Sequence, residues 1–356
     1  MRNRLVLFAS LAAALSACSR SPETRPPTTQ AGTSAGEVVV YVALDRQFSE
    51  PILNDFAALT GIRVRPAYDT ESTKSVGLAN RIRAESARPR CDVFWNNEIL
   101  NTIRLKQDGL LQPCRPSQAE NYPAQYLDPE GCWYGFAARA RVLIANSELV
   151  PPAARPRCVA DLADPRWKGR VGVAKPLFGT TATHVACLFA TMGEEPAKAL
   201  LGSLKANGIQ VLGGNKGCAE AVGAGRLALA LTDTDDAMIE LDAGRPVNML
   251  LADAGAADSG VLLLPNTLAL VKDCPNAEGG LRLIDYLLSP EVEARLAAGT
   301  SAQIPLNRHV RQRSRVATAT GAADLNSIRY MEVDFSQAAA AFPAAAAFVE
   351  REFLAP

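Results

Sequence analysis

Apolar stretches of strand length alternate with amphipathic stretches of helix length along most of the chain. The run 37–43 (EVVVYVA) is rich in β-branched residues, which is typical of a strand. Apolar residues recur at helical spacing over 49–60, and Gly61 follows them, where a glycine commonly ends a helix. A second strand is expected over 62–66. Because the links between strand, helix and strand are short, these segments predict a parallel βαβ unit with a right-handed crossover.

The same alternation continues towards the end of the chain and predicts an α/β fold. Further strands are expected over 91–95, 135–146, 171–174, 209–212, 227–231, 260–264 and 267–271. Further helices are expected over 76–82, 99–107, 281–288, 292–297 and 338–350. The part of the chain from Glu37 onward is long enough for two domains of ordinary size.

Polar side chains follow most of the expected strands, at the point where each strand ends. The carboxyl ends of parallel strands meet at one edge of a sheet, and ligands of open α/β sheets bind at that edge. The sequence therefore predicts one ligand site built from several loops. Its candidate residues are Asp45, Thr70, Glu71, Asn96, Asn97, Glu98, Thr180, Thr181, Asn215, Asp233, Thr234 and Asp235.

The densest of these polar groups follows the apolar run 227–231. Three carboxylates and two hydroxyls lie within the next five residues, TDTDD. Two interpretations are open: a solvated loop that caps the next helix, or the ligand-facing end of a buried strand. In the second interpretation Asp233 and Asp235 face the ligand, and Asp236 caps the helix.

Carboxylates that gather at one place repel each other unless a cation compensates them. A hard metal ion with oxygen ligands would fit, with Asp45, Glu98 and Asp235 as its ligands, and so would an organic amine. Basic residues in the same loops leave a zwitterionic or phosphonate-like solute open as well. These residues are Arg46, Lys74, Lys175 and Lys216.

The first residues indicate export. Arg2 and Arg4 precede a short apolar run, and the sequence Leu-Ser-Ala-Cys ends at Cys18. This pattern predicts a lipoprotein signal peptide over 1–17, with Cys18 as the lipid anchor at the periplasmic or extracytoplasmic face of a bacterial membrane. An ordinary secretory signal is the alternative. The segment 18–36 is rich in Ser, Thr, Pro and Gly, and is expected to be a flexible tether.

Composition narrows the class of function. The 37 basic and 37 acidic residues balance and are interspersed, which argues against a nucleic-acid partner. Seven cysteines follow Cys18, and Cys114 and Cys132 flank one polar loop, so we expect them to form a disulfide. With two histidines and no C-x-x-C motif, a His/Cys metal site is not expected. His184 and His309 stand apart, and without a nucleophile motif no enzyme and no resident cofactor are expected.

Several longer segments together resemble the substrate-binding proteins of bacterial ABC importers, in particular the group with the ferric-ion-binding proteins. The segments VVVYVALD, CDVFWNNE, GFAARARVLIAN and DLADPRWKGRVGVA occur in the family's order. The pair of helices joined by Leu-Ser-Pro-Glu, 281–297, is the most specific match. The resemblance implies a type II periplasmic-binding-protein fold of two α/β lobes with a ligand cleft between them. We expect residues 37–140 plus 262–303 in the first lobe and 141–261 plus 304–356 in the second.

The resemblance also implies a monomeric receptor that delivers its solute to an ABC permease and catalyses nothing. Ferric-binding members hold iron with adjacent tyrosines, and Asp235 and Asp236 stand at the matching positions. Asp45 stands at the family's first-lobe histidine, and Asn97 or Glu98 at its acidic ligand. The expected ligand is a metal ion such as ferric iron or a small polar solute. Phosphonate-like, amine or apolar solutes, or a receptor coupled to a sensor, are the alternatives.

Overall fold

The computed structural model describes residues 36–69, 76–255 and 259–354, and these described residues belong to one compact unit. The predicted signal peptide, Cys18, nearly all of the predicted tether, and the candidates Thr70 and Glu71 lie outside the described residues. Within them, no helix combines the length and apolar character needed to cross a membrane.

The strands form two parallel groups that are joined by two long antiparallel strands. The strand order is β2-β1-β3-β10-β5-β8-β6-β7, with β4 added to β10 and β9 added to β5. Neighbouring strands among β1, β2 and β3 are parallel, as are those among β6, β7 and β8. The bounds are β1 Glu37–Val42, β2 Arg63–Tyr68, β3 Val93–Asn96, β4 Leu111–Gln112, β5 Tyr134–Asn146, β6 Val171–Ala174, β7 Gln210–Leu212, β8 Leu229–Asp233, β9 Val247–Leu250 and β10 Leu263–Val271.

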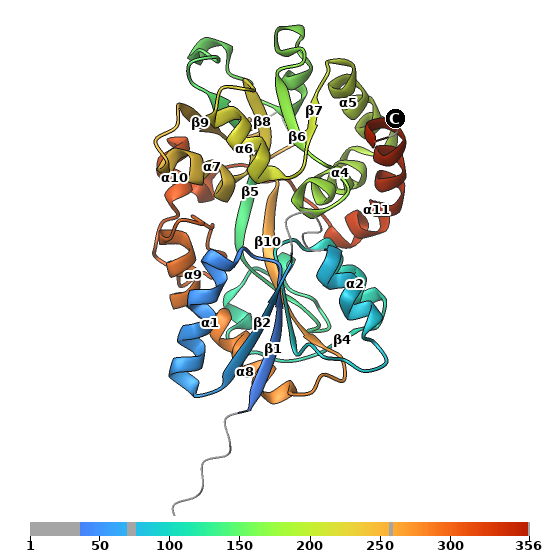
Figure 1. The fold of residues 1–356 in the computed structure, drawn as a ribbon, viewed down its shortest axis with the longest axis vertical. Helices are drawn as coiled ribbons and strands as arrows, with labels where there is room; N and C mark the ends of the chain where they lie inside the picture. The colour runs from blue at the N-terminus through green and yellow to red at the C-terminus, as the bar shows by residue number, and fades with distance from the viewer. Residues whose placement is uncertain (1–35, 70–75, 256–258, 355–356) are drawn as a thin grey trace, which may run out of the picture. The chain divides into compact units, whose positions relative to one another are not determined.

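Helices cover both strand groups. Figure 1 shows α1, α2, α8 and α9 around the first group and α4 to α7 around the second, with β5 and β10 running between them. The bounds are α1 Arg46–Thr60, α2 Val76–Ala84, α3 Leu100–Gln107, α4 Gly179–Met192, α5 Glu194–Ala206, α6 Asn215–Gly223, α7 Thr234–Asp242, α8 Ala277–Leu287, α9 Pro290–Ala298, α10 Arg315–Thr320 and α11 Phe335–Val349. The predicted α/β fold with two lobes is confirmed.

Local sequence accounts for the first βαβ unit. Gly61 ends α1 with a φ of 71°, a left-handed conformation that glycine adopts without a steric penalty, and its amide donates to Ala57. Ile52, Leu53 and Phe56 lie on the buried side of α1 and pack in the hydrophobic cluster under β1. β1 and β2 pair in parallel, as the spacing predicts.

One predicted break in a strand is absent. The sequence suggests separate strands on either side of Pro265, but β10 runs from Leu263 to Val271. The register against β5 shifts between Leu264 and Asn266. Pro265 has no amide hydrogen to give to the ladder, so the strand accommodates it as an irregularity and continues.

The last long helix, α11, packs against α4 of the second group and α3 of the first. Phe348 lies 6.0 Å from Phe189 of α4, measured between ring centres. The guanidinium of Arg104 in α3 lies over the ring of Phe342, 4.7 Å from its centre. This helix therefore contacts both groups (Figure 1).

The predicted disulfide between Cys114 and Cys132 is absent from the structure, where both are free thiols. The two side chains pack into different hydrophobic clusters. The main chain brings the two cysteines near each other, because the Cys114 amide donates to the backbone oxygen of Gly131. Their side chains nevertheless pack in two different hydrophobic clusters.

Candidate functional site

Strand β5 carries two buried arginines on one face. Arg139 and Arg141 are two positions apart, so their side chains leave the strand on the same side. Their side chains are only 3% and 1% exposed. A charged group is expensive to bury unless it is paired, so both guanidiniums need carboxylate partners within the structure.

Asp233 is the main partner of Arg141. The two residues lie opposite each other where β5 pairs with β8, and Arg141 Nη1 lies 2.7 Å from Asp233 Oδ1. The other carboxylate oxygen of Asp233 accepts from Thr180, at 2.5 Å, and from Asn215, at 2.9 Å. Burial opposes ionisation of Asp233, but the two arginines outweigh it and lower the pKa of this carboxyl.

Arg139 joins the two lobes at the same place. Its Nη1 lies 3.3 Å from both Asp233 and Asp235, and its Nη2 donates to the backbone oxygen of Asn97, which follows β3. Burial opposes the charge of Arg139, yet the surrounding aspartates, Asp235 foremost, raise its pKa. The guanidinium is therefore a permanent cation in the middle of the site.

Two helices begin at this site. The first turn of α4 carries Thr180 and Thr181, and Asn215 opens α6. Thr181 donates to Asn215 at 3.1 Å and accepts from Arg141 at 3.3 Å. The unpaired amides of a helix N-terminus attract anions. Hydroxyls, an amide side chain and two helix starts thus surround the arginine pair.

The site encloses a small pocket at the junction of the lobes. Its free volume is about 20 Å³, which is close to the space of one water molecule. Asn97, Arg139, Thr180, Asn215 and Asp236 are among the residues that line it. Within the described ranges, Asn97 Oδ1 and Arg139 Nε are buried without a hydrogen-bond partner. Both a donor and an acceptor therefore remain for a ligand.

Residues 102–320 match the family model described as bacterial extracellular solute-binding protein. The chain belongs to this family of solute-binding proteins. It is 29% identical to iron uptake protein A1 of Synechocystis sp. over 309 residues, which cover 83% of this chain and 84% of that relative. It is 26% identical to the major ferric iron-binding protein of Neisseria meningitidis, over 79% of this chain and 84% of that relative.

The fold agrees with this family. A solved structure from Trichodesmium, in complex with iron and citrate ligands, superposes with a TM-score of 0.74 at 22% sequence identity. The match covers 89% of this chain and 99% of that one. The predicted membership among the substrate-binding proteins of bacterial ABC importers is confirmed.

The carboxylates of this solute-binding protein gather differently from the predicted metal set. Among the described residues, the acidic group that could hold a metal ion is Asp233, Asp235 and Asp236, with ligand atoms within 4.8 Å of one another. The predicted combination of Asp45, Glu98 and Asp235 does not form such a group.

Glu98 is absent from that group because it caps a helix. Its oxygens accept from the amides of Leu100 and Asn101, at 2.7 and 3.0 Å, at the start of α3. Thr183 of α4 also donates to it, at 3.0 Å. Asp45 lies half-buried at the start of α1, before Arg46.

The other predicted ligand residues divide into two sets. Asn97, Thr180, Thr181, Asn215 and Asp233 line the pocket. Asn96 and Thr234 are buried within the protein's own hydrogen bonds: Asn96 donates to Glu98 and Thr102, and Thr234 accepts from the amide of Ala140. 

The division among the aspartates also differs from the prediction. Asp236 lines the pocket, whereas it was expected to act as a helix cap. Asp235 contacts Arg139. Both aspartates lie in the first turn of α7, so Asp235 contacts the arginine while Asp236 faces the pocket beside it.

Sequence reasoning missed Arg139 and Arg141. The signal was nevertheless present, because two arginines at alternate positions interrupt an otherwise apolar stretch of thirteen residues, GFAARARVLIAN with the preceding Tyr134. The expectation that the aspartates need a compensating cation is met in part within the fold. Two guanidiniums pair with Asp233 and Asp235.

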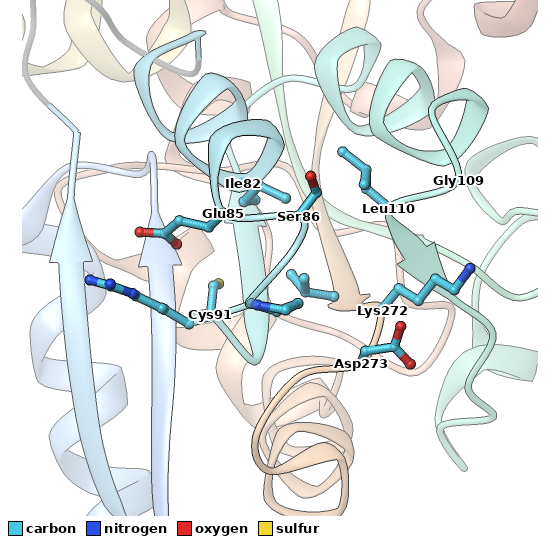
Figure 2. A pocket seen from close by; sticks show the side chains of 11 residues that line it. Ile82, Glu85, Ser86, Cys91, Gly109, Leu110, Lys272 and Asp273 are labelled. Atoms are coloured by element: carbon cyan, nitrogen blue, oxygen red, sulfur yellow. The ribbon is translucent and has the colours of Figure 1, made fainter.

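A larger cavity, of about 140 Å³, lies elsewhere (Figure 2). Cys91, just before β3, and Lys272 and Asp273, just after β10, line it. It therefore lies at the amino ends of the parallel strands, opposite to the edge where ligands bind. Glu85 on its wall is held by Tyr41 and Arg81.

Proposed function

We propose that the chain captures ferric iron as a complex with a small, multidentate oxyanion and passes it to the permease of an ABC importer. Two relatives support iron as the cargo, since they are named for iron uptake and ferric iron binding. One observation supports a complex as the form of the cargo: a cluster of three aspartates lies against two buried arginines, and Asp233, Asp236 and Arg139 of this group line the pocket. We further propose that the protein binds and delivers this solute without catalysing a reaction.

The charges in the pocket favour a complex over a bare ion. Three carboxylates against two guanidiniums leave one negative charge, and two helix N-termini offset part of it. None of the residues lining the pocket is a tyrosine. Ferric iron requires several anionic oxygen ligands, and a chelating anion would bring those that the pocket lacks.

The two sides of the pocket suit the two parts of such a complex. Asp236 and its neighbours would face the metal ion. Arg139, Thr180 and Asn215 would face the oxyanion, because they offer donors and positive charge. The free volume of about 20 Å³ means that the lobes must separate for a complex to enter.

We propose that the two lobes consist of residues 37–140 plus 262–303 and of residues 141–261 plus 304–356.

Thermal unfolding with defined iron species tests this proposal. We expect ferric citrate to raise the melting temperature, with a stabilisation of about 2.7 kcal/mol when its free concentration is 100 times Kd. Citrate alone and ferric nitrilotriacetate serve as comparisons for the anion and for iron with another chelator. Asp236→Asn should weaken ferric citrate binding at least tenfold, whereas Glu278→Gln, at an exposed position of α8, should not.

The same experiment can contradict the proposal. If 2-aminoethylphosphonate or phosphate stabilises the protein and no ferric complex does, the cargo is an organic or inorganic oxyanion. If no probe stabilises it, the ligand class is wrong.

We also propose that Cys18 carries a lipid that holds the protein at the periplasmic or extracytoplasmic face of a bacterial membrane. The basic, apolar and Leu-Ser-Ala-Cys segments at the start of the chain support this. Cys18→Ser should move the protein from the membrane fraction to the soluble fraction and abolish labelling with radioactive palmitate. A chain that is processed and released in the same way with either residue would contradict the anchor.

A further inference from the structure

Three segments connect the two strand groups, and they meet beside one buried carboxylate. They are β5, β10 and the segment 302–307, whose Ile304 pairs with Ala138 of β5. Glu293 of α9 is 1% exposed. It accepts hydrogen bonds from the amides of Ala137 in β5 and of Leu306 and Asn307 in the third segment, the last at 2.7 Å.

The remaining connection joins the same network. Asn266 of β10 donates to the backbone oxygen of Ala137 and, at 2.9 Å, to the side chain of Gln303. Glu293 and Asn266 therefore hold Ala137 from its two sides. Through these contacts, all three connections between the lobes are hydrogen-bonded to one another around Ala137.

The backbone is irregular in each connection at this level. Ala137 and Ala302 have φ angles of 42° and 46°, which alanine rarely adopts. In β10 the register shifts between Leu264 and Asn266. Strained residues persist only where their surroundings hold them, and they mark places where the chain can change conformation. The cluster has the features of a hinge between the lobes.

The hydrogen bonds of Glu293 favour its ionised form. Each of the three partners is an N–H donor, so a proton on Oε1 would set an O–H against the amide of Ala137, and a proton on Oε2 would set one against the amide of Asn307. Burial raises the pKa of Glu293 to about 7, against the opposing effect of those three amides.

Few other charges face this carboxylate. Tyr122 is the titratable neighbour, and its hydroxyl donates to Leu288. On α9 itself, Glu291 is exposed and Arg295 pairs with Asp55. On the third segment, Arg308 is exposed. Among the described residues, no ion pair reaches Glu293.

We infer that Glu293 is a proton-controlled clamp on the hinge: ionised, it holds the lobes together, and protonated, it lets them separate. The inference concerns regulation of the proposed solute site and rests on that function for its purpose. A proton on Oε1 weakens the bond to Ala137 and frees a strained residue, and a proton on Oε2 weakens the bond to Asn307 and frees the third connection. The amides of these connections lower the pKa of Glu293, so a hinge that opens while this carboxyl stays buried binds a proton more tightly than the closed hinge does. A mildly acidic medium would then favour the open form and release of the solute.

The test follows the hinge directly and needs no ligand. In the full chain labelled with ¹⁵N, the amide signals of Ala137, Leu306 and Asn307 are followed from pH 5 to 8.5. The radius of gyration is measured by small-angle scattering over the same range. We expect the three amides to titrate together with a midpoint near 7, and the radius of gyration to increase on the acidic side.

Two variants separate the clamp from general effects of pH. Glu293→Gln presents a neutral side chain, so it should resemble the acidic form of the wild-type protein at every pH. Glu291→Gln, on the exposed side of the same helix, should titrate as the wild type does. A midpoint below 5, or a radius of gyration that does not change across the titration, would overturn the inference. If Glu293→Gln does not fold, the wild-type titration alone decides, and neither result depends on whether iron binds.

Discussion

Replacement of Arg141 by leucine will lower the free energy of unfolding by about 3–5 kcal/mol. Arg141 is 1% exposed in its side chain, and it lies 2.7 Å from Asp233, which is equally buried. Without it, Asp233 keeps Arg139 at 3.3 Å as its remaining cation. Urea unfolding, with the midpoint and slope compared between variants, measures the loss.

Two controls show whether charge or packing is responsible. In the double variant Arg141→Leu, Asp233→Leu the carboxylate that lost its closest cation is gone as well, so much of the stability should return. Arg46→Leu breaks an exposed pair with Glu50 and should leave stability nearly unchanged. If the single and double variants at the buried pair are equally unstable, the loss comes from packing and not from an unpaired charge.

Acidification will reduce stability through His184, by up to about 5 kcal/mol between pH 6.5 and 3. Burial, helped by the charge of Arg141, lowers the pKa of this imidazole to about 3. The folded protein therefore keeps His184 neutral while the unfolded chain binds a proton below about 6.5. The stability that depends on this difference is complete above 6.5 and is lost as the pH falls through the folded-state pKa.

His184→Leu should abolish this part of the pH dependence, because leucine binds no proton in either state. His309→Leu, at an exposed position, is the matched control and should keep the slope of the wild type. Glu293 acts in the opposite direction: its pKa is raised to about 7, so acidification from 7 towards 4.5 favours the folded state. The test is therefore the difference in the free energy of unfolding between His184→Leu and the wild type, measured at each pH. Parallel curves for the two proteins would contradict it.

The fold was predictable to the extent that it depends on local patterns. The first strand, the helix that ends at Gly61 and the long apolar strand before Asn146 are all where periodicity places them. Pro265 misled the prediction, because a proline was taken to end a strand that only changes register there. The disulfide failed because spacing along the chain does not show which core a thiol faces.

The sequence predicts where the polar residues of the site gather, but it does not predict which arginines pair with the aspartates there. The rule that ligands bind at the carboxyl ends of strands directs attention to Asn97, Thr180 and Asn215, which line one pocket in the structure. It cannot show that Glu98 turns towards the start of α3, since that depends on side-chain geometry. The pairing of Arg141 with Asp233 depends on the register between β5 and β8, and one sequence does not reveal register.

Helix α11 has a consequence for the separation of the lobes. It is fixed to the second lobe through Phe348 and Phe189, and it reaches the first lobe at the contact between Phe342 and Arg104. A rotation of the lobes that separates α3 from α11 pulls Arg104 away from the aromatic ring, and such a contact is worth roughly 0.5–1 kcal/mol even at exposed sites, whereas both residues here are half-buried. The C-terminal helix thus adds a contact across the two lobes that favours the arrangement in which Phe342 and Arg104 meet.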